Sequence, residues 1–600
     1  MDKAQPDYIQ LLKRRHEQRV ADRGVWNNHF EDVATYISPR RLGFVGIRTP
    51  GEKRLSRLYD STGIQANQLL ASGLHGMATN PASKWFTLRI LGERIAQPDG
   101  KSVDINEIPH IRKWTSDVEH LLWQRLYQPG TNFASSLDES YLDLGAFGTA
   151  IIFTGQKDDG SLLFQCRTLA ECLIDENADG FVDTVDRKFE MTVRQMLQLA
   201  SKALSEDIRW DLPKRIQDLA DAGKYDDKIW VIHSVHPREE YNPDSKLDQK
   251  DMPYRSVYFT TEDAHVLQEG GFPEFPYLVP RWSKVPGEVY GRSPGMTALP
   301  DVKMLQAKEL TYIKVLQKNA DPPMWLRDDG VVGATRSVPG GINYWRGDPN
   351  QGVMMMPTNI QGLSALVESQ QMLRDRIRNI FHVDVLQMVD QREMTLGEAR
   401  MRMMERMRLM GPVVGRLEAE LLGPLIARVI GILSRQSLLP PAPEEIQDKE
   451  YSVEFVSPLA TAQKQEEMGG IMAALQPLSV LGPEIAMKAL SRKVNLDRFV
   501  DHLWDINHLD PDLLNTDEEI AAQDQQEQGM MAAQMMQQGG VPAADMMQKG
   551  AGAVKQLADA QASGGVDINQ IAQGAGQVLQ MPQMRKALAQ AQGGGQGGGM

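Results

Sequence analysis

Three short patterns in the chain contain residue types that could bind a metal ion or carry out catalysis. The first has the side chains and spacing of a calcium-binding loop: Asp175, Asn177, Asp179, Gly180, Asp183 and Asp186. Such a loop needs an amphipathic helix on each side, but residues 162–166 and 181–185 alternate like strands. We therefore expect a β-hairpin turn here rather than a cation site.

The second pattern, Gly291-x-Ser293-x-Gly295, matches the nucleophile elbow of serine hydrolases. In that elbow the backbone N–H of the residue after the serine stabilises the oxyanion. Here that residue is Pro294, which has no N–H. The pattern therefore predicts a turn that opens a helix, and it argues strongly against a serine hydrolase.

The third pattern is the pair His233 and His236 on a predicted strand. Side chains three positions apart on a strand point to opposite faces, so these two rings cannot share a metal ion. The two cysteines, Cys166 and Cys172, are too few for a disulfide framework or a zinc site. The chain also lacks a standard Walker A phosphate loop. We expect no metal, no cofactor and no enzymatic activity, so any ATP-driven role would need another protein as the motor.

The composition indicates a protein of several domains without a membrane anchor. The chain has 600 residues, of which 42% are hydrophobic, and a formal net charge of −14. An acidic surface is unsuited to coating nucleic acid, but it suits DNA that only passes by. The start lacks the apolar core of a signal peptide, and the longest apolar run, 421–433, is too short to span a bilayer. We expect a soluble cytosolic protein in a reducing compartment.

Residues 1–295 mix helical and strand patterns, which predicts an α+β body. We expect helices over 5–35, 64–77, 109–127 and 133–145, and strands over 85–90, 161–166, 171–175, 180–185, 228–236 and 255–260. The first helix also carries four arginines that we expect on its solvated side: Arg14, Arg15, Arg19 and Arg23.

Two further helices, within 296–320 and 358–381, each carry one narrow and mostly apolar seam. The seam residues recur at spacings of three and four: Val302, Leu305, Glu309, Tyr312 and Leu316, then Leu363, Leu366, Gln370, Leu373, Ile377 and Ile380. Packed, nearly antiparallel helices need such seams. The other faces of both helices are polar and carry Lys308 and Arg374, so we expect both helices to be solvent-exposed over most of their circumference. An ordinary helical hairpin in a globular core is the alternative.

A third and unusually long helix is expected from Thr395 to about Arg435. Thr395 and Glu398 form a capping box at its start. Gly411-Pro412 and Gly423-Pro424 each remove a helical hydrogen bond, so we expect bends there. A strand follows over 451–456, then helices from 461 to 508, and finally a tail rich in Gln, Met, Ala and Gly that we expect to be mostly disordered.

Several segments, by their order and spacing, resemble the portal (head-to-tail connector) proteins of short-tailed bacteriophages. They are residues 59–63 (Tyr-Asp-Ser-Thr-Gly), 73–77, 290–296 (Tyr-Gly-Arg-Ser-Pro-Gly-Met), 321–323 (Asp-Pro-Pro), 394–398 (Met-Thr-Leu-Gly-Glu) and 411–425. The resemblance covers about residues 5–515. It implies a portal-type subunit of several domains that assembles into a dodecameric ring with a central channel at one capsid vertex.

The resemblance also implies how the chain divides. The regions are the wing body 1–295, stem helix 296–320, clip 321–357, stem helix 358–381, channel loop 382–394, long kinked wing helix and following strand 395–458, helical crown 459–515 and tail 516–600. The channel loop would approach DNA through His382, Gln387, Gln391 and Arg392. The stem would line the channel through Lys308, Lys314, Lys318, Arg374 and Arg378. The clip would dock partners through Trp325, Arg327, Arg336, Tyr344, Trp345 and Arg346, unless its aromatic residues only pack the clip's own fold.

As a portal, the protein would let a separate terminase motor package double-stranded genomic DNA and would later let the genome leave. The implied partners are further copies of the chain, non-specific and transient DNA, terminase, tail adaptor proteins, and the major capsid and scaffolding proteins, with no membrane. The implied location is the virion, after assembly in the host cytoplasm. The alternative is a virion structural or scaffold protein without a DNA channel.

Overall fold

The structure is a computed structural model. It describes residues 6–41, 43–46, 51–52, 58–82, 84–91, 95–96, 102–157, 159–201, 210–241, 251–320, 324–326, 353–355, 363–386, 410–447, 449, 451–455, 500 and 530. The chain divides into two compact units, Met1–Asp512 and Leu513–Met600. The helices and strands with bounds below all belong to the first unit.

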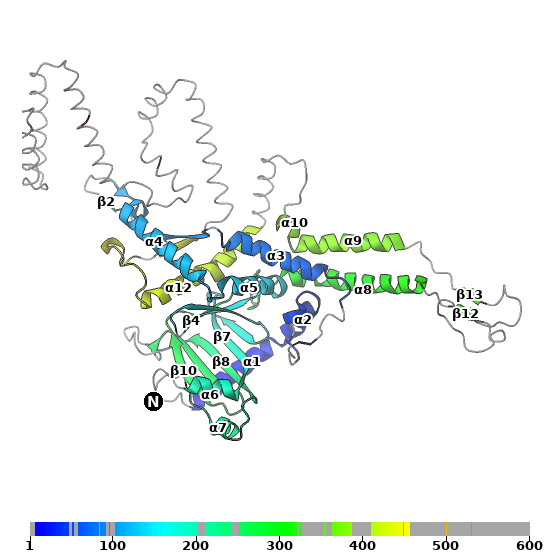
Figure 1. The fold of residues 1–600 in the computed structure, drawn as a ribbon, viewed down its shortest axis with the longest axis horizontal. Helices are drawn as coiled ribbons and strands as arrows, with labels where there is room; N and C mark the ends of the chain where they lie inside the picture. Colours follow the sequence, from blue (N-terminus) through cyan, green and yellow to red (C-terminus); the bar gives the residue numbers. More distant parts are fainter. Residues whose placement is uncertain are drawn as a thin grey trace, which may run out of the picture. The chain divides into compact units, whose positions relative to one another are not determined.

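A five-stranded antiparallel sheet of strand order β10-β9-β8-β7-β6 forms one half of the body (Figure 1). Its strands are β6 (Cys172–Glu176), β7 (Val182–Thr192), β8 (Lys228–Pro237), β9 (Tyr254–Thr260) and β10 (Val266–Phe272). Helix α1 (Pro6–Asp22) packs on one face of this sheet, where Ile9 and Leu12 contact Ile232, Val257 and Phe259. Helices α6 (Val193–Ser201) and α7 (Lys214–Asp221) share a second small core with β7 and β8.

The main core contains side chains of a second sheet and four helices, together with buried side chains from residues 118–126 and 417–433. This sheet has the order β11-β4-β5, with β4 (Ile151–Gln156), β5 (Leu162–Arg167) and β11 (Tyr277–Leu278). The helices are α2 (Gly24–Tyr36), α3 (Thr62–Ala78), α5 (Phe133–Phe147) and α8 (Pro294–Ala320). Fully buried aromatic side chains such as Phe30, Tyr141 and Phe147 fill the space between them. The expected mixed helix-and-sheet body is therefore confirmed.

One strand pair joins the N-terminal body to a distant part of the chain. Strand β1 (Phe86–Ile90) pairs antiparallel with β14 (Tyr451–Phe455), and Phe86 lies opposite Phe455. Helix α4 (Pro109–Leu126) packs beside β1. Further short elements are the ribbon of β2 (Ile95–Ala96) with β3 (Ser102–Val103) and the 3₁₀ turns Pro39–Arg41, Ile105–Glu107 and Glu444–Ile446.

The long helix is described from residue 410 to Arg435. Its helical hydrogen bonding changes to a π-helical segment at Glu418–Leu422, and α12 (Gly423–Arg435) continues the helix. The π-helical segment directly precedes Gly423-Pro424, where the proline lacks the usual N–H, and the helix runs on through Gly411-Pro412. The bends expected at these two positions stay predictions. The start at Thr395, most of the crown and most of the tail lie outside the described residues. No helix in the described ranges is long and apolar enough to cross a membrane.

The prediction that all four arginines of the first helix face solvent is wrong for two of them. Arg14 and Arg15 are exposed as expected. Arg19 binds Asp186 at 2.7 Å, whereas Arg23 is buried and donates to the backbone carbonyls of Leu169, Ala170 and Cys172. These partners lie about 150 residues away in sequence, so helical periodicity alone could not reveal them.

Candidate channel and docking sites

The candidate channel wall is a helical hairpin formed by α8 and α9 (Leu363–Ile380), which lie side by side (Figure 1). The predicted apolar seam is confirmed near the body, where Val302, Leu305 and Ile377 have no exposed surface. The seam opens toward the other end, since Leu316 is 41% exposed. From Thr311 to Ala320, and in α9 before Gln370, no described residue is buried.

Polar contacts attach the base of this hairpin to the body. The Gln306 amide accepts hydrogen bonds from the N–H groups of Tyr59 and Asp60 and donates to the Asp60 carbonyl at 2.7 Å. The Asp60 carboxylate accepts from Arg374 on α9 at 2.9 Å. Burial alone would raise the pKa of Asp60, but hydrogen bonds from Thr62 and Arg374 outweigh it and lower that pKa. The segment before α3 therefore holds both helices of the hairpin.

The five predicted channel-lining side chains fall into two groups. Lys308 donates to Ser369 across the hairpin, and Arg374 pairs with both Asp60 and Glu309. The prediction that Lys308 and Arg374 face away from the seam is therefore wrong. The other three, Lys314, Lys318 and Arg378, are exposed. Whether these side chains line a channel stays a prediction.

The predicted channel loop begins as ordered structure. Val383–Leu386 form the short helix α10, which packs on α3 and α9, so the prediction of a loop from residue 382 is wrong for 383–386. The His382 ring stacks on Trp282, with ring centroids 6.3 Å apart. Gln387, Gln391 and Arg392 lie outside the described residues.

The candidate clip is described only at its two strands. Strand β12 (Met324–Leu326) pairs antiparallel with β13 (Val353–Met355), which places Trp325 opposite Met354 in the register. The other predicted docking residues lie outside the described residues: Arg327, Arg336, Tyr344, Trp345 and Arg346. The docking role of these residues stays a prediction.

The candidate calcium loop is a hairpin turn, as predicted. Strands β6 and β7 pair antiparallel on either side of it. The Asn177 side chain accepts hydrogen bonds from the N–H groups of Asp179 and Phe181, and Gly180 adopts a φ of +82°. Arg19 binds the carboxylates of two residues of the pattern, Asp175 at 3.2 Å and Asp186 at 2.7 Å. Arginine thus supplies the positive charge that these two carboxylates need.

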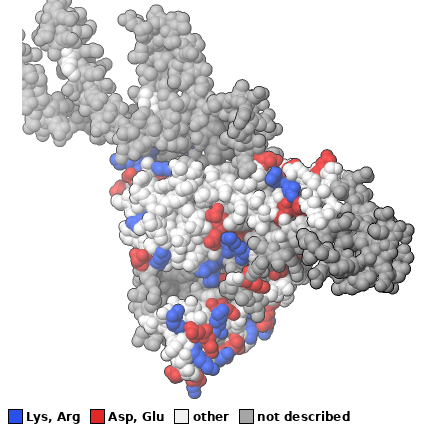
Figure 2. Space-filling view, turned by 45° about the vertical axis from the view of Figure 1, so that its right-hand side comes forward, with Lys and Arg blue, Asp and Glu red and all other residues white. Residues whose placement is uncertain are grey.

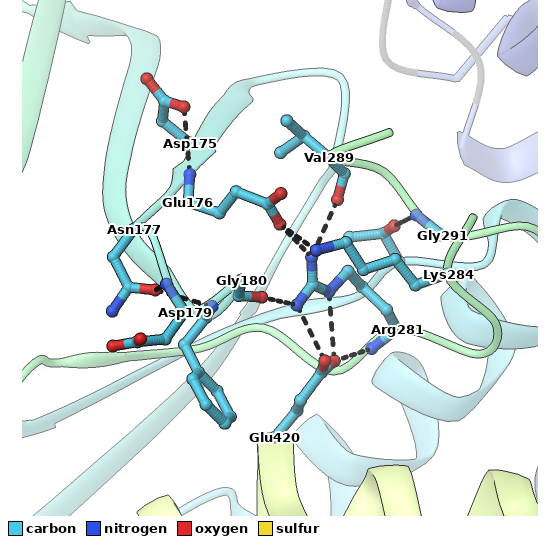
Figure 3. Close-up of polar contacts among 12 residues, drawn as sticks. Asp175, Glu176, Asn177, Asp179, Gly180, Arg281, Lys284, Val289, Gly291 and Glu420 are labelled. Atoms are coloured by element: carbon cyan, nitrogen blue, oxygen red, sulfur yellow. Dashed lines mark hydrogen bonds and ion pairs between the residues drawn. The ribbon is translucent and has the colours of Figure 1, made fainter. Parts of the chain in front are cut away.

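A second arginine, Arg281, joins this turn to the long helix (Figure 3). Its side chain is 1% exposed and donates to Glu176 at 2.8 Å, to the Gly180 carbonyl at 2.7 Å and to Glu420 at 2.8 Å. Lys284 also binds Glu176, at 2.7 Å. Burial opposes the charge of Arg281, but the two carboxylates outweigh it and raise the pKa of the guanidinium.

Sequence reasoning did not single out Arg281, although one signal was available. The residue interrupts an otherwise apolar run, Leu278-Val279-Pro280-Arg281-Trp282. A charged residue inside such a run is buried only when it has partners. The run could therefore have indicated a buried ion pair, but not the identity of the distant partner Glu420.

Ser293 caps helix α8 and is not exposed as a nucleophile would be. Its hydroxyl donates to the Ala146 carbonyl and accepts from the Met296 N–H at 2.9 Å, and the residue is 3% exposed. Pro294 occupies the first helical position, where a missing N–H costs nothing. The predicted turn that opens a helix is confirmed.

His233 and His236 face opposite sides of the sheet, as predicted. His233 stacks on Tyr258 at 3.9 Å and contacts the Tyr277 hydroxyl, whereas His236 contacts the Tyr8 hydroxyl of α1. Burial lowers the pKa of His233 to about 3 and that of His236 to about 4, so both rings are neutral at pH 7. Within the described part of the chain, no group of His, Cys, Asp and Glu could hold a metal ion.

The charges on the visible face do not form a patch of one sign. Figure 2 shows acidic and basic side chains intermingled on this face. Tight binding of a nucleic acid would need a cluster of Lys and Arg to neutralise phosphates. On this face, therefore, nothing indicates a site that captures nucleic acid.

Comparison with known proteins identifies the family. The model of the family described as "Bacteriophage head to tail connecting protein" matches residues 10–514. A probable portal protein of Bordetella phage BPP-1 is 30% identical over 537 residues, which cover 87% of this chain and 92% of that protein. The portal protein of Salmonella phage epsilon15 is 28% identical over 531 residues, which cover 86% of this chain and 90% of that protein.

A chain from the virion of a native gene transfer agent particle overlaps 71% of this chain and 91% of its own length. The identity is 12% and the TM-score is 0.34, which is too low for an argument about the fold. The family model and the two phage relatives cover most of the chain and agree with each other. The chain belongs to the bacteriophage head-to-tail connecting proteins, the portal proteins of phage virions.

Proposed function

We propose that this protein forms a dodecameric ring at one capsid vertex, through which a separate terminase packages double-stranded genomic DNA and the genome later leaves. Tail adaptor proteins then attach to the same ring. The observation that carries the proposal is the α8–α9 hairpin, in a chain that belongs to the portal family. The hairpin is attached at its base and is not buried over its other half.

The form of the hairpin suits a wall built from several copies. Apolar side chains remain uncovered on both helices, including Met304 at 48%, Val367 at 43% and Met372 at 62% exposure. Neighbouring copies would remove this apolar surface from water, which favours association. A repeated head-to-tail contact of this kind closes into a ring when the rotation between copies closes.

The clip and the channel loop complete the proposed function. Strands β12 and β13 close the segment that we assign to terminase and tail docking. Residues 387–394, after α10, are the segment that we place nearest to the DNA, with Gln391 and Arg392 as its contacts. Few positive charges in this segment suit DNA that slides rather than binds tightly.

Electron microscopy of the purified full-length protein in negative stain tests the ring. We expect closed rings with a central hole at several salt concentrations. Monomers or open filaments under all conditions would contradict a portal ring. Rings without a hole would favour the alternative, a virion structural protein without a DNA channel.

A loop variant tests the DNA contact. The deletion should remove residues 387–392, which include Gln391 and Arg392, and keep Val383–Leu386, because Val383 is buried and α10 packs on α3. We expect normal rings, and particles that package or retain less DNA than wild type. Particles with a normal DNA content would contradict the assignment of this segment.

A further inference from the structure

His382 has an unusual backbone conformation between two helices. Helix α9 ends at Ile380 and α10 begins at Val383, and His382 between them has a φ of +54°. L-residues other than glycine rarely adopt this left-handed conformation, although histidine does so more often than most. Such a conformation persists only when the surrounding structure holds it, so the contacts of His382 show what stabilises this turn.

Two contacts and two buried neighbours hold this residue in place. The His382 N–H donates to the Asn379 carbonyl at 3.0 Å. Its ring stacks on Trp282 with an angle of 22° between the ring planes, and Trp282 is itself only 8% exposed. The neighbours on both sides are buried, with Phe381 at 0% and Val383 at 3% exposure. The buried neighbours Phe381 and Val383 and the stacked His382 ring therefore fix this turn.

Trp282 is a rigid support for this ring. Its backbone N–H donates to the Gly148 carbonyl at 2.9 Å. It also follows Arg281, whose guanidinium binds Glu176 and Glu420. The backbone of Trp282 is therefore held in place, and its largely buried ring gives the His382 ring a fixed surface to stack on.

We propose that His382 is a positioning residue: its left-handed turn and its stacking on Trp282 fix the direction of α10 and thereby where the proposed channel loop begins. This inference rests on the proposed function, because the loop has a role only in a DNA channel. It also replaces direct DNA contact as the role of His382. Burial lowers the pKa of the ring, and a neutral, partly buried imidazole is a poor partner for phosphate.

Hydrogen exchange of the full-length protein tests the turn directly. His382→Val removes the ring and disfavours the left-handed backbone, whereas His382→Asn removes the ring but tolerates that backbone. We expect amide exchange over 381–386 to be about tenfold faster in His382→Val and about threefold faster in His382→Asn. Trp282→Phe keeps an aromatic partner but leaves space in the core, so its exchange over 381–386 should lie between wild type and His382→Asn. Asp384→Asn, at an exposed position on α10, is the matched control.

The DNA content of assembled particles tests the positioning role. His382→Val should form rings as wild type does but package less DNA, and His382→Asn should lie between the two. Equal exchange in the Val and Asn variants, faster exchange in α12 as well, or unchanged DNA content would each overturn the inference. If the wild-type protein formed no rings, the proposed function would fail, whereas the exchange comparison would still test the turn.

Discussion

The body and the α8–α9 hairpin use charged side chains in different ways. In the body, Arg281 and Asp186 are each 1% exposed and have full sets of partners. In the hairpin, the Arg376 side chain is 66% exposed although it binds Asp301, and Lys314 and Lys318 are also exposed. Buried charges such as these fix the fold of the body, whereas most hairpin charges remain available to solvent or to a partner.

This difference decides which variants report on function. Removing one member of a buried network leaves its partners charged and unpaired, which is strongly destabilising. Removing an exposed charge leaves a site that water fills, and the cost is small. Variants of the hairpin surface can therefore test DNA passage without unfolding the protein.

The largest effect is expected for Arg281→Met. This change removes the shared partner of Glu420 and Glu176, which keep Arg416 at 3.4 Å and Lys284 at 2.7 Å, respectively, as charged partners, so we expect a loss of about 3 kcal/mol in the free energy of unfolding. Urea unfolding followed by intrinsic fluorescence measures it. The double variant Arg281→Met with Glu420→Gln should recover part of the loss, because it removes one buried charge that has lost its main partner. If Arg281→Met unfolded like wild type, the body would not depend on this network.

Glu119 is an exception within the body, because its carboxylate is buried with few partners. It accepts from the Leu88 N–H at 2.7 Å, and Lys84 is 4.0 Å away. Burial raises the pKa of Glu119 from 4.5 to about 7. The folded state therefore binds a proton that the unfolded state releases, and stability falls as pH rises from about 4.5 to 7.

We expect Glu119→Gln to remove this pH dependence. Glutamine keeps the acceptor for Leu88 and carries no charge, so the variant should be more stable than wild type at pH 8 by up to about 3 kcal/mol. At pH 4 the two proteins should be equally stable. Thermal unfolding at both pH values measures this. A variant that is less stable at pH 8 would show that the charged form of Glu119 is needed.

Asp186 should show the opposite pH dependence. Burial raises its pKa, but hydrogen bonds and charges from His16, Arg19 and Ser234 outweigh burial and lower the pKa to about 2. The stabilisation is present above about pH 4 and is lost as pH falls toward 2. Asp186→Asn should cost about 2 kcal/mol at pH 7.

Thermal unfolding of Asp186→Asn between pH 7 and pH 3 tests this sign. The gap in stability between wild type and variant should narrow below about pH 4. Asp179→Asn, at an exposed position of the neighbouring turn, is the control and should change little. A gap that stays constant with pH would mean that the lost contacts matter through packing rather than charge.

The sequence predicted elements better than it predicted partners. Periodicity placed α3, α4, α5, α8 and both strands of the β6–β7 hairpin, because their patterns are local. It could not pair β1 with β14, whose residues lie more than 360 positions apart. It also missed the burial of Arg23, since the carbonyls that bind its guanidinium come from residues 169–172, at and just before the start of β6.

The candidate site shows the same limit. The seam predicted at Val302, Leu305 and Ile377 is buried, because apolar spacing reports on packing. Arg374 was misplaced, because its partner Asp60 lies 314 residues away. The ordered start at Val383–Leu386 was missed, because four residues are too few for a helical period and α10 depends on contacts with α3.

The smallest effect on stability is expected for Lys314→Gln with Lys318→Gln. Both lysines are exposed on α8, so the free energy of unfolding should change by less than about 0.5 kcal/mol. If these lysines face DNA in the channel, the variant should retain packaged DNA less well at low salt, and the difference should shrink at high salt because ions screen the contact. Genome retention in particles at two salt concentrations measures this.

Lys224→Gln, exposed three residues after the end of α7 and remote from the hairpin in sequence, is the control. Equal retention by both variants at low salt would assign Lys314 and Lys318 to a surface that DNA does not approach. The difference between the charges of the body and those of the hairpin would then affect stability alone.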